Sequence, residues 1–401
     1  MKRLSFLTVL FYPILSFGVT QEDVVRSSLQ NVPKVLEAVQ KIEEQANKTQ
    51  SALGAFDAKI KGDVDSRTTG FYSGDSYKVQ AVKPLQFFNS KVYGGHRLSR
   101  GTFPDYEGKT VTLSEGETFI GFSVSFLRDS FIDINRHNLW LKQQNEVQAQ
   151  INLDRVKINV QTMALQSYWT WLVKGYELKV YENILKLAQV RAKQISKRIR
   201  AGDLARIYEV ENNQYIKKRQ ADVVRSRVDF QQASYFLSLF YRDFNGVPKT
   251  LSQKDLPDLK GVKLPLMTDQ SRIYERAVSA NLNLKTLNSK RKQAELDLRL
   301  GKNATLPKLD FNFEWNQDLG VPTEATTVTP ATLIGDENRL TLNVEFPLQF
   351  RKGLGKIRAG KAKVSQIKFK EKWTREKLKV KVQSLMPVSY THLTLPTIYS
   401  V

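Results

Sequence analysis

The chain has 401 residues, of which 41% are hydrophobic and 25% charged, and it carries a net charge of +22 with no cysteine. The absence of cysteine excludes disulfides, thiolate metal sites and a lipid-modified N-terminal cysteine. A balance this basic raises the possibility of a nucleic-acid partner. Half of the net charge, however, falls within residues 351–382, and such a run on one helix is most often a solvated face.

The N-terminus, residues 1–18, has the pattern of a secretory signal peptide. Two basic residues precede an apolar run over residues 4–17, and Gly18 suits cleavage after it. The run is interrupted by Pro13 and is shorter than the roughly 20 residues that a membrane span needs. We therefore expect an exported mature chain, and export argues against nucleic acid as a partner.

Four segments predict β-strands, and the first follows an amphipathic helix expected over residues 24–51. Apolar and polar residues alternate over residues 56–61, 120–126, 309–316 and 340–346. This period is typical of strands with one apolar and one polar face. A soluble sandwich would explain the pattern equally well by itself. The large aromatics, the strand length of about 9–11 residues and the predicted export together favour transmembrane barrel strands.

Four strands cannot close a barrel, and open sheet edges are not tolerated in lipid. We therefore expect two or three copies to pool their strands. A long Gly- and aromatic-rich insertion, residues 70–118, separates the first two strands, and the sequence assigns it no role. A Thr-rich loop, residues 321–338, separates the other two.

The longest regular stretch predicts a helical hairpin. From Asp133 the chain continues for 69 residues without proline, about 100 Å of helix at 1.5 Å per residue, with Ser130 as its N-cap. We expect Gly202 to take the left-handed turn position and Asp203 to cap a return helix over residues 204–244. An apolar seam for a partner helix is expected at Val180, Ile184, Ala188, Ala192, Ile195 and Ile199.

The order helix, strand, strand, long helical hairpin occurs twice, which predicts an internal duplication. The second repeat is truncated, because its long helix is expected only over residues 353–386. The C-terminal tail resembles one reading frame of a common transposase sequencing adapter and is excluded from the fold prediction. The expected signal peptide, first repeat, linker, second repeat and tail cover residues 1–18, 19–244, 245–270, 271–386 and 387–401.

No segment predicts catalysis. Residues 355–362 imitate a phosphate-binding loop, but Ala stands where Ser or Thr would hold Mg²⁺. His96 and His137 have no metal-ligand spacing around them. Asp57 and Asp310 occupy equivalent strand positions, which favours two lumen-facing barrel residues over a catalytic pair. We expect no enzymatic activity, no cofactor and no metal.

A series of short segments, in this order, resembles the TolC-like outer-membrane efflux proteins over about residues 24–386. One opens the long helix, one forms the hairpin turn, one enters a strand and one leaves a strand, at residues 132–136, 200–207, 306–309 and 346–348. Two features depart from the family pattern: Tyr208 stands where an acidic residue is common, and the second hairpin tip is absent.

The resemblance implies an α+β membrane protein in the cell outer membrane, extending into the periplasm. Such a homotrimer has a 12-stranded barrel, four strands per chain, continued by a tube of helical hairpins. It docks to a periplasmic adaptor and an inner-membrane pump and acts as the exit duct for small molecules or ions. A type I protein-secretion channel is the near alternative, and an exported, non-channel coiled-coil scaffold is the competing class.

Three sets of residues are expected to act in such a channel. The lipid-facing set on the barrel is Phe311, Phe313, Trp315, Leu340, Leu342 and Val344. The lumen-facing set is Asp57, Asp310, Asn312 and Asn343. The adaptor-docking tip, at the end of the long helix, is Gly202, Asp203, Leu204, Ala205 and Arg206.

Overall fold

The computed structural model describes residues 18–70, 72–103, 111–258, 270–322 and 336–398. The predicted signal peptide lies outside them, apart from Gly18. The chain forms two compact units, a helical unit of residues 1–41 and 152–266, and a sheet unit of residues 42–151 and 267–401. Within the described ranges, no helix combines the length and apolar character that crossing a membrane requires.

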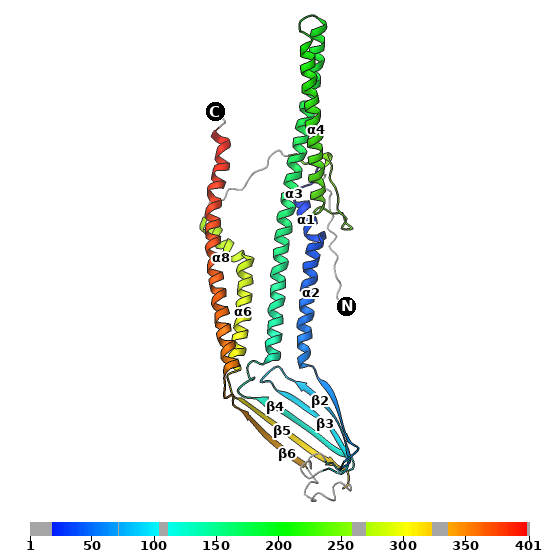
Figure 1. Cartoon of the computed structure of the whole chain (residues 1–401), viewed down its shortest axis with the longest axis vertical. Helices are drawn as coiled ribbons and strands as arrows, with labels where there is room; N and C mark the ends of the chain where they lie inside the picture. Colours follow the sequence, from blue (N-terminus) through cyan, green and yellow to red (C-terminus); the bar gives the residue numbers. More distant parts are fainter. Residues whose placement is uncertain (1–17, 71, 104–110, 259–269, 323–335, 399–401) are drawn as a thin grey trace, which may run out of the picture. The chain divides into compact units, whose positions relative to one another are not determined.

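The sheet unit contains a six-stranded antiparallel sheet (Figure 1). Its strands lie side by side in chain order, each hydrogen-bonded to the next. Each strand has 9 to 12 residues, which is close to the length of a tilted membrane strand. They are β1 Lys59–Arg67, β2 Gly74–Pro84, β3 Lys91–Gly101, β4 Gly116–Ser125, β5 Lys308–Leu319 and β6 Asp336–Glu345.

The prediction of four strands per chain is wrong, because the insertion contributes a further hairpin, β2–β3. In the turn of this hairpin Phe88 and Asn89 both have positive φ, 49° and 46°, as a type I′ turn requires. The amide N–H of Ser90 donates to the Phe87 carbonyl oxygen over 3.0 Å and closes the turn. Phenylalanine is a rare residue at such a position, so the sequence carries no ordinary turn signal there.

The first predicted strand begins later than expected. Residues 54–56 form the 3₁₀-helix η1 (Gly54–Phe56), and Phe56 is buried in a small core with Ala52 and Leu139. Asp57 is the C-cap of η1 and lies outside β1. The placement of Asp57 in a strand is therefore wrong, while β4, β5 and β6 confirm the other three predicted strands.

The helix predicted over residues 24–51 and the corresponding helix of the second repeat are each interrupted once. The first is divided into α1 (Gln21–Asn31) and α2 (Pro33–Leu53), because the residue before a proline is pushed out of the helical region, and Val32 has ψ 124°. The second is divided into α5 (Gln270–Ala280) and α6 (Leu282–Asn303), where the Asn281 side chain accepts a hydrogen bond from the amide of Leu284.

The long helix is confirmed as α3 (Ile134–Arg200), 67 residues without a break. Its N-cap is Asp133 and not Ser130, since the Asp133 carboxylate accepts hydrogen bonds from the amides of Asn135 and Arg136 over 2.7 and 3.0 Å. An aspartate at this position satisfies two of the donors that a helix N-terminus leaves unpaired.

The return helix, α4 (Ile207–Ser238), is shorter than the predicted 204–244. Its end has a tertiary cause. The hydroxyl of Ser27 on α1 accepts a hydrogen bond from the amide of Arg242 over 2.8 Å, and this amide would otherwise continue the helical ladder. The sequence around residue 240 carries no helix breaker, so the stop could not be predicted locally.

Helices α3 and α4 pack together within the helical unit. The fully buried Trp171 stacks on Phe230 with ring centroids 6.2 Å apart. Lys174 donates to Glu177 and lies 3.3 Å from Asp229, and these hydrogen bonds raise the pKa of Lys174. The predicted seam residues on α3 are half-buried except for Val180, which is 55% exposed.

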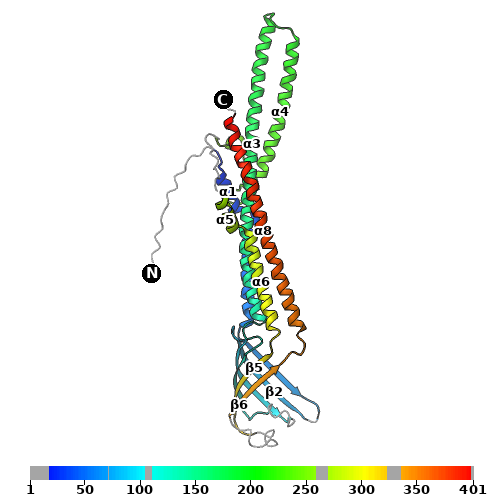
Figure 2. The ribbon, with the colours of Figure 1, turned by 90° about the vertical axis from the view of Figure 1, so that its left-hand side faces the viewer.

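In the sheet unit α6 packs against the last helix, α8 (Arg351–Ile398) (Figure 2). The glycines that imitate a phosphate-binding loop lie inside α8, and one of them, Gly360, permits a close helix contact. A Cβ at Gly360 would lie 3.2 Å from the Leu298 Cα, and one at Gly301 would lie 3.0 Å from the Lys356 Cβ. Helix α8 extends beyond residue 386, at which the prediction ended it.

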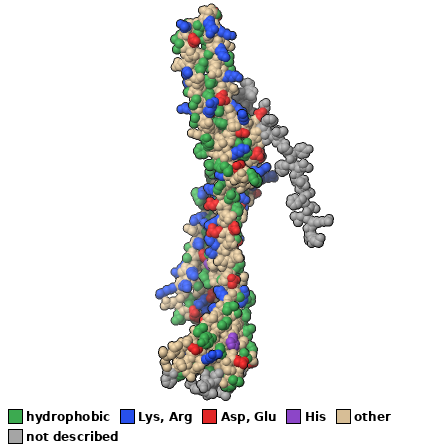
Figure 3. Space-filling model, turned by 90° about the vertical axis from the view of Figure 1, so that its right-hand side faces the viewer, with side chains coloured by type: hydrophobic (Ala, Val, Ile, Leu, Met, Phe, Trp, Pro, Cys, Tyr) green, Lys and Arg blue, Asp and Glu red, His purple; other side chains and the backbone are tan. Residues whose placement is uncertain are grey.

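Basic side chains are distributed along the helices on the face drawn in Figure 3, not gathered into one patch. On α8 the charged residues with described side chains are mostly exposed. Two of its lysines have acidic neighbours, Lys363 with Asp297 at 3.0 Å and Lys372 with Glu376 at 4.0 Å. This matches the interpretation of the basic run as a solvated face.

A buried ion pair holds the segment between β4 and α3. Asp133 and Arg136 are each 5% exposed, and the Arg136 guanidinium donates to the Asp133 carboxylate and to the backbone carbonyls of Asp129 and Ser130. Asn303, at the end of α6, exchanges hydrogen bonds of 2.8 Å with the backbone and side chain of Asp129. The ends of two helices and one strand are therefore fixed by a single polar network.

We expect Arg136→Met to lower the free energy of unfolding by about 3–5 kcal/mol, because it leaves the Asp133 carboxylate buried without its partner. Denaturant unfolding followed by circular dichroism measures the change. The control is Lys48→Met, which removes an exposed i,i+4 pair with Glu44 and should change stability by about 0.5 kcal/mol or less. Equal effects of the two substitutions would contradict a structural role for the buried pair.

Candidate functional site

The sheet separates apolar from polar side chains across its two faces. Phe311 pairs with Leu342, and Phe313 with Leu340, on one face of β5 and β6. Directly opposed residues point to the same side of a sheet, and successive residues alternate. The register therefore places all six predicted lipid-facing residues on one face, and Asp310, Asn312 and Asn343 on the other. Which environment each face contacts stays a prediction.

The apolar face continues over all six strands, including the hairpin that sequence reasoning missed. On β4, Ile120 lies opposite Trp315 and Phe122 opposite Phe313. On β3, Val92 lies opposite Phe122. The remaining large apolar members on β1 and β2 are Ile60, Val64, Tyr77 and Val79.

This apolar face is the exposed one, which is the reverse of a soluble sheet. On β4 the exposed side chains include Ile120 and Phe122, whereas Glu117 and Ser125 are buried. The exposed fraction reaches 82% at Ile60. A soluble monomer rarely exposes a continuous apolar surface, so this face indicates contact with lipid or with another protein.

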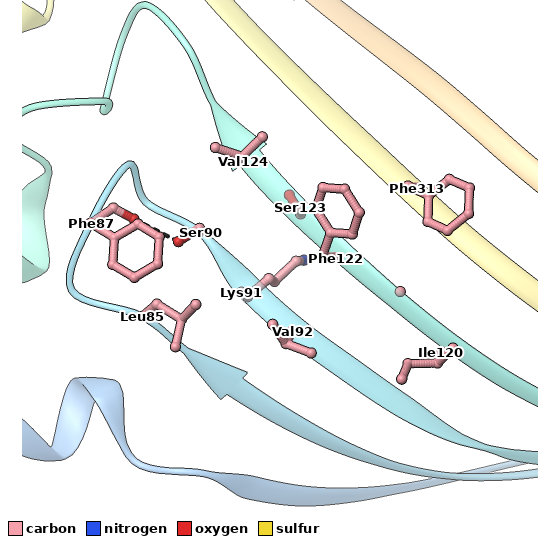
Figure 4. Close-up of a pocket in the computed structure, with 11 residues that line it drawn as sticks. Leu85, Phe87, Ser90, Lys91, Val92, Ile120, Phe122, Ser123, Val124 and Phe313 are labelled. Atoms are coloured by element: carbon pink, nitrogen blue, oxygen red, sulfur yellow. Dashed lines mark hydrogen bonds between the residues drawn. The ribbon is translucent and has the colours of Figure 1, made fainter.

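A groove of about 550 Å³ lies within the apolar face, beside the β2–β3 turn (Figure 4). The sticks in Figure 4 show aliphatic and aromatic side chains of β3, β4 and β5 around it. Ser90 contributes one of the few polar groups, and its hydroxyl already donates to the Phe87 carbonyl over 2.6 Å. The apolar lining is Leu85, Phe87, Val92, Ile120, Phe122, Val124 and Phe313.

Aromatic rings gather at the ends of the strands that lead into the helices. Phe88 contacts Phe87 and Phe131, with ring centroids 6.3 and 6.1 Å apart. Phe126, just after β4, contacts Phe311 at 6.4 Å. Such rings at one end of an apolar strand surface have the pattern of the aromatic girdle at a membrane interface.

The polar face is densely charged and internally paired. Arg97 on β3 contacts Glu117 on β4, and Lys308 lies 2.7 Å from Asp310. Ser125 donates to Asp310 over 2.8 Å, which ties β4 to β5. Charged and hydroxyl groups in this density need water or each other, so the face suits a water-filled lumen.

The predicted docking tip is a turn of defined geometry. Gly202 has φ 83°, its amide donates to the Ile199 carbonyl over 3.1 Å, and the Asp203 amide donates to the Arg198 carbonyl over 2.9 Å. This pair of bonds is the Schellman motif. The prediction that Asp203 caps the return helix is wrong, because the N-cap of α4 is Arg206, without a side-chain cap.

At this turn Leu204 is half-buried, while Ala205 and Arg206 are exposed. Sequence reasoning missed three exposed apolar residues on the first turn of α4. Ile207, Tyr208 and Val210 are 58%, 47% and 64% exposed. The available signal was a cluster of large apolar residues within eight positions after a helix-breaking glycine.

The two histidines that lie before the C-terminal tail each have a side-chain partner. His137 Nε2 lies 3.0 Å from an Asp297 carboxylate oxygen, and His96 Nδ1 lies 3.1 Å from the Thr118 hydroxyl. In the part of the chain that the structure describes, no three His, Asp or Glu side chains are grouped closely enough to hold a metal.

No protein-family model matches the chain, and no curated protein matches its sequence. Solved structures do match. The Campylobacter jejuni CmeC outer membrane channel has a TM-score of 0.51 at 10% identity, over 99% of this chain and 81% of that one. The outer membrane protein VceC from Vibrio cholerae gives 0.54 at 10% identity, over 95% and 80%.

The open state of the Neisseria gonorrhoeae MtrE outer membrane channel gives a TM-score of 0.54 at 11% identity, over 93% of this chain and 72% of that one. At these identities the likeness concerns the fold. The chain therefore has the fold of the TolC-like outer-membrane channels, and the resemblance seen in its sequence is confirmed at that level.

We expect Phe313→Arg to cost about 2–4 kcal/mol of stability in a lipid bilayer, because it places a charge on the apolar face. Asn312→Arg, on the neighbouring position and the opposite face, is the matched control and should cost much less. Urea unfolding from lipid vesicles, followed by tryptophan fluorescence, measures both. If both faces tolerate arginine equally, the strands do not lie in a membrane.

Proposed function

We propose that the protein is an outer-membrane channel that serves as the exit duct of a tripartite exporter and extends into the periplasm. The observation that carries this proposal is the reversed sheet, with its apolar face exposed and its charged face partly enclosed. A membrane strand needs this arrangement, because lipid covers one face and water the other. The channel fold, shared with the outer-membrane proteins above, supports the same conclusion.

A single copy leaves both edges of the sheet open. Unpaired backbone groups cannot be hydrated in lipid, so membrane strands occur only in closed barrels. We propose that three copies close the ring, as a homotrimer. The duct is passive: it holds no cofactor and performs no catalysis, and its cargo is small molecules or ions. A type I protein-secretion channel is the alternative cargo class.

The turn at residues 202–206 is proposed as the docking site for a periplasmic adaptor, through which the inner-membrane pump is engaged. Its chemistry supports this role. Arg206 offers charged hydrogen bonds, and the exposed apolar residues that follow on α4 offer contact area for a partner helix. Gly202 by itself is explained by the turn geometry alone.

We expect the protein purified in detergent to be a trimer, because only pooling of strands satisfies the edge backbone groups. Light scattering coupled to size-exclusion chromatography measures the mass. A monodisperse monomer that retains its β-structure would contradict the proposal. The competing class, an exported coiled-coil scaffold, instead requires water-soluble protein after cell lysis and no ion conductance in planar bilayers.

We expect the double substitution Leu204→Ser and Arg206→Gln to abolish export and adaptor cross-linking while trimer assembly and melting temperature stay unchanged. Neither side chain is needed for the Schellman turn, so a structural role predicts no loss. The matched control is Val224→Ser with Arg225→Gln, the same chemical changes at exposed positions on α4 away from the turn. Export that survives the tip substitutions would show that the tip assignment is wrong.

A further inference from the structure

We propose that β1 of one copy pairs with β6 of the next in the register that places Lys59 opposite Glu345, and that the hairpin β2–β3 is part of the barrel wall. Three copies then form an 18-stranded ring, six strands from each. This inference rests on the proposed trimeric channel, whose family resemblance implied 12 strands.

The two strands that would pair are the open edges of the sheet. The strand order places β1 at one end and β6 at the other. All residues of β1 are exposed except Arg67, which is half-buried, and all residues of β6 except Arg339. Each of these two edges therefore presents a full strand length to a partner strand. We propose that this partner strand belongs to a second copy of this chain.

The direction of the edges permits this pairing. All five pairings within the sheet are antiparallel, and an even number of strands makes β6 run opposite to β1. Joining β6 of one copy to β1 of the next therefore continues the antiparallel pattern. The two strands are also matched in length, with 9 residues in β1 and 10 in β6.

The charges on the polar face select the register. With Lys59 opposite Glu345, wherever a charged residue of β1 lies opposite a charged residue of β6, the two carry opposite charges. Cross-strand pairs of opposite charge stabilise a sheet, and like charges directly opposite destabilise it. The three resulting pairs are Lys59 with Glu345, Asp65 with Arg339, and Arg67 with Glu337.

Registers shifted by two residues place like charges opposite each other. A shift by two in one direction places Glu337 opposite Asp65, and a shift by two in the other places Arg339 opposite Arg67. A shift by one moves every apolar residue to the polar face. In the proposed register Leu340 instead meets Val64 on the apolar face.

The hairpin β2–β3 belongs to the wall because it shares both faces of the sheet. On β2 the exposed side chains alternate with half-buried ones, and Val79 lies on the apolar face while Lys78 and Gln80 lie on the polar face. Lys78 also covers the Phe119 ring on β4, 4.7 Å from its centroid. Barrel diameter grows roughly linearly with strand number, so 18 strands give about 1.5 times the diameter of 12.

Cysteine pairs test the register, since the chain has no native cysteine. Val64 and Leu340 are 70% and 65% exposed, and in the proposed register their Cα atoms fall within disulfide range. We expect V64C/L340C, oxidised in native membranes, to run as a covalent trimer on denaturing gels. The matched controls, V64C/L342C and V64C/N338C, each represent a shift by two and should stay monomeric.

The outcomes separate this inference from the proposed function. Trimers linked by a control pair in place of V64C/L340C overturn the register. A detergent trimer in which none of the three pairs links overturns edge pairing of β1 with β6 but leaves the trimer standing. A monomer in detergent instead contradicts the proposed channel itself.

Single cysteines test the hairpin. We expect a water-soluble maleimide to label Gln80→Cys in intact trimers and to leave Val79→Cys unlabelled, because only the polar face contacts water. After denaturation both should react, which controls for intrinsic reactivity. Equal labelling of the two before denaturation would place β2–β3 outside the membrane and leave four wall strands per copy, which overturns the 18-stranded ring.

Discussion

The hydrogen-bonding needs of the backbone at the edges of the sheet are the constraint on which the rest of the molecule depends. In water an exposed edge strand is hydrated, but in lipid each unpaired amide and carbonyl costs several kcal/mol. Within the sheet each strand is hydrogen-bonded to its neighbours, and in the described part of the chain the outer edges of β1 and β6 are left without a partner strand. In lipid, a reversed sheet with two open edges would need further strands to pair with those edges, and the proposed assembly rests on this requirement of the backbone.

Polar contacts hold the junction between the sheet and its helices at the end of β4. Between β4 and α3 the chain bends at Asp129, whose φ is 71°, and Arg136 satisfies the carbonyl groups exposed by that bend. Asn303 attaches α6 to the same bend. Buried hydrogen bonds that run in several directions from Arg136 and Asn303 favour one geometry of this bend.

Helix packing explains several residues that look functional in the sequence. Gly360, one glycine of the phosphate-loop-like segment, permits close contact between α6 and α8, since an added Cβ there would lie 3.2 Å from Leu298. Gly175 on α3 does the same for Leu256 from the linker, whose methyl groups would lie 2.7 Å from an added Cβ. In both places the glycine allows two elements to come into van der Waals contact, and this packing accounts for the residue.

The elements whose signal is local could be predicted from the sequence. Period-two alternation identified β4, β5 and β6 and divided their residues correctly between two faces, because side-chain direction in a strand follows from backbone geometry alone. The long proline-free stretch identified α3, and Gly202 identified its end, because a left-handed residue there needs glycine. The resemblance to outer-membrane channels came from the order of such segments.

The features that depend on distant partners became visible only in the folded chain. The hairpin β2–β3 turns at Phe88 and Asn89, and its strands are held by pairing with β1 and β4. Helix α4 ends just before Arg242, whose amide donates a hydrogen bond to the Ser27 hydroxyl. A more local case is Asp133, which replaces Ser130 as the cap and forms a buried ion pair with Arg136, three residues on. In each case a long-range hydrogen bond or a buried charge overrode a local propensity, since its free energy exceeds the few tenths of a kcal/mol per residue that separate local conformations.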